Sequence, residues 1–97
     1  MDNKGILKIN VLFYHGTNSE NIQGIIENGF SEDSISCATM DRYYATGYGD
    51  SLIKFKYPVN ITFNNIFYFI KEYFNKSLTI GVSGFKPNYI NLIPYIR

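Results

Sequence analysis

His15 is the residue of this sequence with the clearest capacity for chemistry, and it is the only histidine in the chain. It follows an apolar run at 11–13 and precedes Gly16 and Thr17, directly before a segment with helical periodicity. A neutral imidazole can donate a hydrogen bond to a hydroxyl group or accept one from it. A glycine lets a planar group approach the backbone closely. We therefore expect a binding site to be organised around residues 12–30.

Two tyrosines, Tyr44 and Tyr48, form a second group with possible chemistry. They are four residues apart, so on a helix they would share one face. An aromatic face attracts a cationic ring through cation–π interaction. The alternative interpretation is that these rings simply belong to the core or to its rim.

Acidic residues and thiols are scarce in the regions that could complement these groups. Beyond Asp50 the sole acidic residue is Glu72, which falls in a predicted helix. The simplest interpretation of Cys37, the single cysteine, is a small buried side chain; a nucleophilic pair with His15 is the alternative. One His and one Cys cannot form a Cys/His zinc site, so we expect no metal.

The length and composition predict one small domain spanning residues 1–97. The net charge of +1 makes a nucleic-acid partner unlikely, although residues 1–50 sum to −4 and residues 51–97 to +5. The basic half could attract an anionic ligand or partner, or it could consist only of solvated lysines. The lone cysteine and the lack of a membrane-length apolar run favour a reducing, cytoplasmic location. The codon bias implied by abundant Asn, Ile, Lys, Tyr and Phe fits a bacterium or a phage-infected cell.

The elements that must position His15 can be read from residue periodicity. Alternation at 6–14 predicts a strand whose core face carries Leu7, Ile9, Val11 and Phe13. A helix is expected at 20–28, capped by Thr17 or Ser19, with Thr17 and Glu20 as a capping box. Gly29 provides its C-terminal cap. The helix should pack through Ile22, Ile25 and Ile26, with Gly24 allowing close contact to a strand.

The rest of the chain predicts four further strands and two further helices. The strands are expected at 35–40, at 52–57 with Pro58 ending the strand, at 80–85 with a turn or bulge, and at 88–96 with Pro94 at a sheet edge. The helices are expected at 41–48, capped by Asp41, and at 66–75, capped by Asn64 or Asn65, with an apolar face at Ile66, Phe69, Ile70, Tyr73 and Phe74. This order of elements predicts a compact α+β domain.

Three stretches of the chain together resemble the ADP-ribosyltransferase fold. They are YHGT before the capped helix, SISCATMDRYYATGYGDSLIKF with its small residues and tyrosines, and GVSGFKPNYINLI at the end of the chain. The likeness is to the group with a His–Tyr–Glu signature, which includes small bacterial and phage members such as anti-CRISPR ADP-ribosyltransferases. It covers most of residues 11–96 and implies a small split β-sheet with two or three short helices.

The resemblance also implies a cofactor and a role for each site residue. The cofactor would be NAD. His15 would bond the ribose beside the nicotinamide, and Gly16 would offer its backbone to the nicotinamide amide. Thr17 would lie beside the adenine-side ribose. Tyr48 would stack on the nicotinamide ring, with Tyr44 packed nearby.

The sequence departs from that group at the catalytic glutamate. The corresponding position, just before a hydrophobic strand, is Asn88. An amide cannot stabilise a positively charged transition state as a carboxylate does. Either the activity is weak, or Asp50 or Glu72 replaces the glutamate, or the protein is a non-catalytic member. Three functions therefore stay open: transfer of ADP-ribose to a protein target, inactive binding of a host protein complex as a phage anti-defence inhibitor does, or an unrelated interaction domain whose aromatic surface is an oligomer interface.

Overall fold

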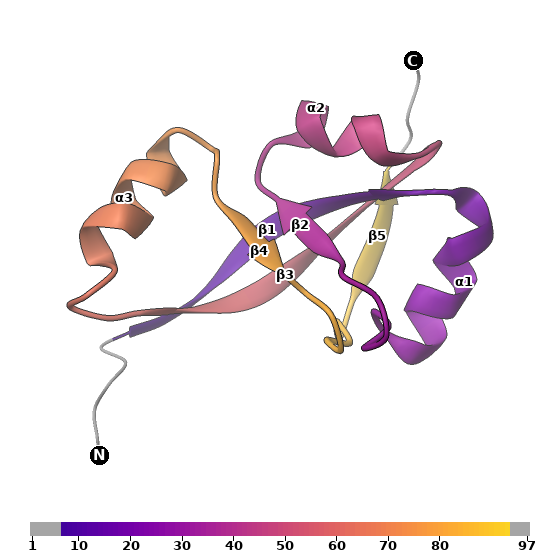
Figure 1. Ribbon diagram of the computed structural model, residues 1–97, viewed down its shortest axis with the longest axis horizontal. Helices are drawn as coiled ribbons and strands as arrows, with labels where there is room; N and C mark the ends of the chain where they lie inside the picture. The colour runs from indigo at the N-terminus through magenta and orange to yellow at the C-terminus, as the bar shows by residue number, and fades with distance from the viewer. Residues whose placement is uncertain (1–6, 94–97) are drawn as a thin grey trace.

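The computed structural model describes residues 7–93, which form one five-stranded sheet with three α-helices and a 3-10 turn (Figure 1). The spatial order of the strands is β4-β2-β1-β3-β5, and every neighbouring pair is antiparallel. The predicted α+β class is confirmed. The elements in chain order are β1 (Leu7–Thr17), α1 (Ser19–Asn28), β2 (Cys37–Thr39), α2 (Arg42–Ala45), the 3-10 turn η1 (Thr46–Tyr48), β3 (Ser51–Ile61), α3 (Ile66–Phe74), β4 (Thr79–Gly81) and β5 (Ile90–Ile93).

The sheet is built on a long ladder between β1 and β3. These strands have eleven residues each and pair along their whole length, from Leu7 with Ile61 to Thr17 with Ser51. By contrast, β1 and β2 are joined through a single pair, Tyr14 with Thr39. The strands β2 and β4 form their own three-residue ladder. The sheet is therefore nearly divided between β1 and β2, and this division is where the candidate site lies.

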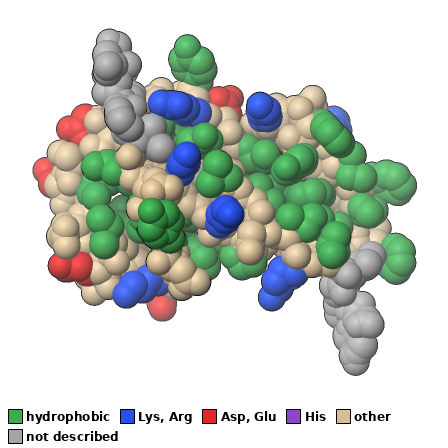
Figure 2. Space-filling model, turned by 180° about the vertical axis from the view of Figure 1, so that it is seen from behind, with side chains coloured by type: hydrophobic (Ala, Val, Ile, Leu, Met, Phe, Trp, Pro, Cys, Tyr) green, Lys and Arg blue, Asp and Glu red, His purple; other side chains and the backbone are tan. Residues whose placement is uncertain are grey.

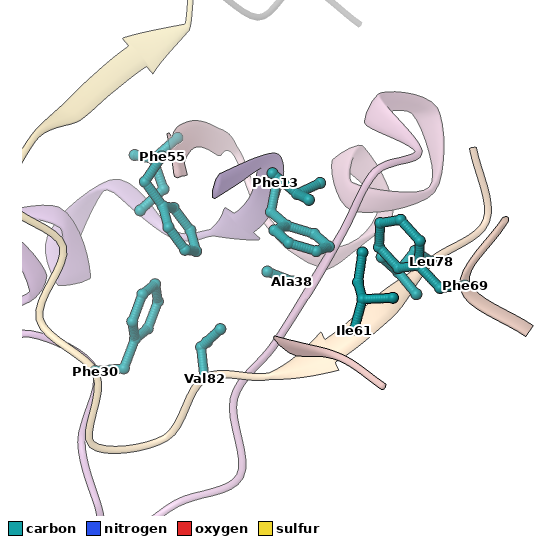
Figure 3. Close-up of a cluster of buried hydrophobic side chains, with 10 residues drawn as sticks. Phe13, Phe30, Ala38, Phe55, Ile61, Phe69, Leu78 and Val82 are labelled. Carbon is teal, nitrogen blue, oxygen red and sulfur yellow. The ribbon is translucent and has the colours of Figure 1, made fainter. Parts of the chain in front are cut away.

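The core lies on the face of the central strands that carries their odd-numbered residues. Phe13 and Phe55 are fully buried, and in Figure 3 they point toward Phe30 and Val82 across the interior. At the end near α3 the cluster is closed by Ile61, Phe69 and Leu78. The predicted apolar face of β1 holds at Val11 and Phe13 but not at Leu7, which is 55% exposed. Leu7 is the first residue of the strand, paired with Ile61 at the last residue of β3.

β3 is longer than the sequence predicted. Pro58 was expected to end the strand, but it lies inside β3, paired with Asn10 of β1. On its other side β3 is paired with β5 only from Leu52 to Phe55. Because the outer edge of β3 is free at Pro58, its missing N–H breaks no bond there, and a proline is tolerated.

The start of α1 also differs from the prediction. The N-cap is Asn18, which makes no side-chain capping bond, so the expected capping box of Thr17 and Glu20 is wrong. Thr17 belongs instead to β1 and is buried. The helix start is capped from outside, because Asp50 Oδ1 accepts a hydrogen bond from the Ser19 amide at 2.8 Å.

The apolar side of α1 is narrower than expected, whereas its end is confirmed. Ile22 and Ile25 pack against the core, but Ile26 is 46% exposed. A Cβ added at Gly24 would meet no atom within 4 Å, so this glycine does not serve close packing. At the other end Gly29 has a φ of 81° and bonds its amide to the Ile25 carbonyl, as a C-terminal cap glycine does.

The remaining elements are shorter than predicted, and α3 is more exposed. β2 is limited to Cys37–Thr39 and β4 to Thr79–Gly81, because Val82–Phe85 forms a turn with Gly84 at a φ of 79°. β5 begins at Ile90, and the predicted strand residues 94–96, with Pro94, lie outside the described range.

α3 is capped at Asn65 by position, yet the Asn65 side chain bonds Thr62 and Asn60 instead of the helix. Of its predicted apolar face, Phe69 is buried, Ile66 is half-buried, and the others are exposed: Ile70, Tyr73 and Phe74.

Candidate functional site

His15 is held at the end of β1 by two neighbours. Its Nδ1 lies 2.8 Å from the Cys37 carbonyl oxygen across the division in the sheet. Because a carbonyl can only accept, Nδ1 carries the proton, and in the neutral ring Nε2 is left as an acceptor. The ring also meets Phe30 edge-on, with 4.9 Å between the centroids. Burial lowers the pKa of His15, and the bond to Cys37 opposes this shift only in part, so the imidazole is neutral at pH 7.

Gly16 sets the distance between β1 and the tyrosine-bearing segment. A Cβ at this position would lie 1.8 Å from the Ala45 carbonyl oxygen, so only glycine allows α2 to pack here. Asp41 fixes the start of α2 by accepting from the Tyr44 amide at 3.1 Å, which confirms the predicted cap. Gly16 therefore brings the tyrosines of α2 and η1 over the end of β1.

Tyr44 and Tyr48 form a pair of rings beside His15. The Tyr48 hydroxyl donates to the Tyr44 hydroxyl at 2.9 Å, and the ring centroids lie 5.5 Å apart in an edge-on arrangement. This bond raises the pKa of Tyr48, since ionisation would remove the donated proton. Both rings are more than half exposed, so they belong to a rim and not to the core.

These residues enclose a pocket of about 280 Å³ where β1 and β2 diverge. Its lining is largely aromatic and small side chains, and no Lys, Arg, Asp or Glu contributes to it. A volume of this size suits one ring system and not a whole dinucleotide. The lining residues are Tyr14, His15 and Gly16 of β1, residues 35–39, Tyr44, Ala45 and Tyr48, and Thr79.

A second hollow of about 610 Å³ adjoins this pocket, and His15 and Ser36 line both. It lies between the end of β1, α1 and the loop after α1. Thr17 lines it, with its Oγ1 accepting from Asn21 Nδ2 at 3.2 Å. The structure therefore brings together four of the predicted binding residues in the first pocket or at its border, and the fifth, Thr17, in the adjoining hollow.

Glu32 is a residue that the sequence interpretation missed. It lies on the loop after α1 and lines the same hollow as His15 and Thr17. The loop is fixed by contacts distant in sequence, since Phe30 exchanges backbone bonds with Phe85 and Gly84, and a Cβ at Gly84 would lie 3.0 Å from Glu32 Cγ. No local sequence pattern encodes such a contact. Among the residues that line the two hollows, Glu32 is the acidic one, and it lines the second hollow.

The two candidate carboxylates, Asp50 and Glu72, and Asn88 at the expected glutamate position all lie elsewhere. Asp50 caps α1 through the Ser19 amide and also accepts from the Ser51 hydroxyl. Glu72 is on α3, where its Oε1 accepts from the Ser77 hydroxyl at 2.7 Å. Asn88 lines a separate groove beside β3 and β5. None of the three lines the pocket or the hollow at His15.

Cys37 differs from its simplest interpretation. Its side chain is exposed and not buried, and it lines the pocket from β2. The contact that the structure records between Cys37 and His15 runs through the backbone carbonyl.

Comparisons with protein-family models, with curated proteins and with solved structures give no match. The resemblance to ADP-ribosyltransferases thus depends on the residues named above. Within residues 7–93, no helix has the length and apolar character needed to cross a membrane. No group of three His, Cys, Asp or Glu side chains in this range could hold a metal ion.

Proposed function

We propose that this protein binds NAD at the end of β1 and transfers ADP-ribose to a protein target. The observation that carries the proposal is the position of His15, which lines both the aromatic pocket and the polar hollow next to it. NAD has the matching parts, a flat cationic nicotinamide ring joined to a polar remainder. When bound, it supplies an ADP-ribosyl group attached to a nicotinamide leaving group.

The aromatic pocket suits the nicotinamide ring. The face of Tyr48 attracts a cationic ring, and Gly16 lines the same pocket. Neutral His15 keeps Nε2 as an acceptor for a ribose hydroxyl. Thr17 and Asn21 offer polar groups in the adjoining hollow. No Lys or Arg lines either hollow, so the pyrophosphate would be held by neutral donors and by water.

Glu32 takes the carboxylate role in this proposal. As the bond to nicotinamide breaks, positive charge builds on the ribose, and a nearby carboxylate lowers the energy of that state. Glu32 lines the hollow with His15, whereas Asp50, Glu72 and Asn88 do not. The acidic partner thus comes from the loop after α1 and not from the terminal strand.

NAD binding is tested by calorimetry with the wild type and with His15→Ala and Tyr48→Ala. Each substitution should weaken binding about tenfold, the effect of removing one good contact. The absence of heat with the folded wild-type protein would remove the proposal.

Transfer is tested with labelled NAD and cell lysate. Glu32→Gln should reduce labelling by at least about a hundredfold, as loss of a charge interaction at the transition state does. Asp33→Asn is the matched control, because Asp33 is an exposed neighbour that does not line the hollow. Equal labelling by Glu32→Gln and the wild type would contradict the assigned role.

A second candidate function, binding of a partner protein without catalysis, is favoured by the surface of α3. Phe67, Ile70 and Phe74 lie on one helical stripe, and Phe63 precedes it. The three phenylalanines are 84%, 83% and 77% exposed in chain order. At roughly 150–250 Å² each, they present on the order of 500 Å² of apolar surface, which equals the largest patch of a typical monomer.

Charge indicates which partner would fit this stripe. Lys71 and Lys76 are exposed beside it, while Glu72 is engaged with Ser77. In Figure 2 hydrophobic side chains crowd the end of the molecule where α3 lies, and the acidic side chains in view lie on the opposite half. Two copies of this chain would bring like charges together, so the partner is a different protein with an apolar groove bordered by carboxylates, such as a component of a host complex.

The double variant Phe67→Ser/Phe74→Ser tests this second function. It should abolish retention of a host protein, whereas Tyr43→Ser, at an equally exposed ring outside the stripe, should retain it. The retained protein is then purified, and its binding should weaken as salt rises. A wild-type dimer that becomes a monomer in the double variant would show instead that the stripe binds a second copy.

A further inference from the structure

A groove of about 650 Å³ lies between the central strands and the segment that leads into β5. It shares no lining residue with the two hollows at His15. Its lining is unlike theirs, because it contains three lysines and three asparagines and no acidic residue. The full lining is Asn10, Leu12, Lys54, Phe55, Lys56, Pro58, Phe85, Lys86, Asn88, Tyr89 and Asn91.

The sheet register places the polar groups of this groove on one face. Asn91 pairs with Lys54 across β5 and β3, and Leu12 pairs with Lys56 across β1 and β3. Paired residues of antiparallel strands project from the same face of the sheet. Lys54 and Lys56 are two residues apart, so they also share this face with their Cα atoms about 7 Å apart.

The opposite wall of the groove comes from the segment after the turn at Gly84. It contributes Lys86, Asn88 and Tyr89. Lys86 and Asn88 are exposed, and the Tyr89 ring is 73% exposed. The lining thus includes cations from two separate segments of the chain and an exposed aromatic ring.

The charges in this groove are uncompensated. Within residues 7–93, none of Lys54, Lys56 and Lys86 is paired with a carboxylate, and the asparagine side chains of the groove make no hydrogen bond to protein. Three ammonium groups that share a concave surface without a carboxylate create a positive potential that attracts anions. The amides add neutral donors for oxygen atoms.

We propose that this groove binds a nucleotide with two or more phosphate groups. The phosphates would contact Lys54, Lys56 and Lys86, since a spacing of about 7 Å between neighbouring lysines suits more than one phosphate. The base would stack on Tyr89, because an exposed aromatic face binds any flat base. The volume is in the range of small-molecule sites, which favours a free nucleotide over a nucleic-acid strand. Asn88, which stands at the expected glutamate position, lines this groove and would offer its amide to a phosphate oxygen.

The test is calorimetric titration of the folded protein with adenosine triphosphate, inorganic triphosphate and adenosine, and separately with a short single-stranded oligonucleotide. Adenosine triphosphate should bind, inorganic triphosphate more weakly, and adenosine not measurably. Lys54→Ala/Lys56→Ala should weaken binding of both phosphate ligands by about tenfold or more. Tyr89→Ala should weaken adenosine triphosphate alone.

The matched control is Lys71→Ala/Lys76→Ala, which removes the same charge from α3 and the turn after it, outside the groove. If it weakens binding as much as the groove variant, net charge alone attracts the anion and the proposal is overturned. Tighter binding of the oligonucleotide than of adenosine triphosphate would also overturn it, in favour of a strand-binding surface. His15→Ala should leave this binding unchanged, so the result is independent of the NAD site.

Discussion

At the scale of single residues, the site depends on one imidazole kept neutral by its surroundings. His15 loses hydration through burial, and its Nδ1 proton is committed to the Cys37 carbonyl. Desolvation disfavours the charged imidazolium, so the ring resists protonation. Its chemical capacity is therefore that of a hydrogen-bond acceptor at Nε2.

This state of His15 predicts how stability depends on pH. The folded pKa is lowered below the ordinary value of 6.5, so the unfolded chain binds the proton more readily. The contribution to stability is present above pH 6.5 and is lost as pH falls through the folded pKa. Because the chain has one histidine, urea unfolding of the wild type should show a loss between pH 7.5 and 5.5 that His15→Gln lacks. Parallel pH profiles for the two proteins would contradict the assignment.

At the scale of elements, close contacts with backbone determine where the tyrosines lie. α2 and η1 pack on β1 through Gly16, and Gly49 approaches the Thr17 carbonyl in the same way, since an added Cβ would be 2.3 Å from it. These two glycines are required by contact and not by a left-handed backbone. The positions of Tyr44 and Tyr48 therefore depend on these glycine contacts.

Substitution of Gly16 tests that dependence. Gly16→Ala would place a methyl group 1.8 Å from the Ala45 carbonyl oxygen, so α2 must shift and stability should fall by about 1–3 kcal/mol. Gly47→Ala is the matched control in the same segment, because its Cβ would meet no atom within 4 Å. Thermal unfolding should separate the two variants clearly. The Tyr44–Tyr48 contact, followed by tyrosine ring resonances in NMR spectra, should change in Gly16→Ala alone.

The external cap on α1 gives a second prediction at this scale. Asp50→Ala removes the acceptor for the Ser19 amide and should cost about 1 kcal/mol, as loss of a helix cap typically does. Asp50→Asn keeps an oxygen acceptor and should recover most of that loss. Urea unfolding measures both, with Asp33→Ala expected to be neutral. An equal loss in the Asn and Ala variants would mean that Asp50 acts by charge and not as a cap.

At the scale of the whole molecule, the large apolar residues form two separate groups. One set fills the core around Phe13 and Phe55, and another remains on the outside of α3. A chain of this size buries only about 60–65% of its surface on folding. Its stability therefore depends on few side chains, and a large exposed aromatic set contributes little to it.

The two sets should respond oppositely to truncation. Phe13→Ala removes a fully buried ring and should cost about 3–5 kcal/mol, a large part of the roughly 5–15 kcal/mol that stabilises a typical domain. Phe67→Ala removes a ring that is 83% exposed, so the free energy of unfolding should change by less than about 0.5 kcal/mol. Chemical denaturation of both variants checks the contrast. A loss above 2 kcal/mol in Phe67→Ala would show that α3 packs more deeply.

Local sequence signals were sufficient for some features and silent on others. Some features depend on residues that are near neighbours in the sequence, and these could be predicted. They are the periodicity of β1 and α1, the Asp41 cap and the Gly29 cap. The capping of α1 by Asp50 joins residues 31 positions apart. The position of Glu32 likewise follows from the contact of its loop with Gly84. Neither contact leaves a periodic pattern, so the sequence alone points to Asp50 or Glu72 as the carboxylate and not to Glu32.

The single pair between β1 and β2 has a consequence for measurement. Within residues 7–93, eleven ladder pairs join β1 to β3, whereas one ladder pair, Tyr14 with Thr39, and the His15 bond to the Cys37 carbonyl join β1 to β2. Amide hydrogens of the β2–β4 ladder should therefore exchange with deuterated water through a local opening that leaves the β1–β3 ladder intact. Any ligand at this junction contacts both parts and should slow that exchange. Amide exchange rates of residues 37–39 would therefore detect ligand binding at this junction even before the ligand is identified.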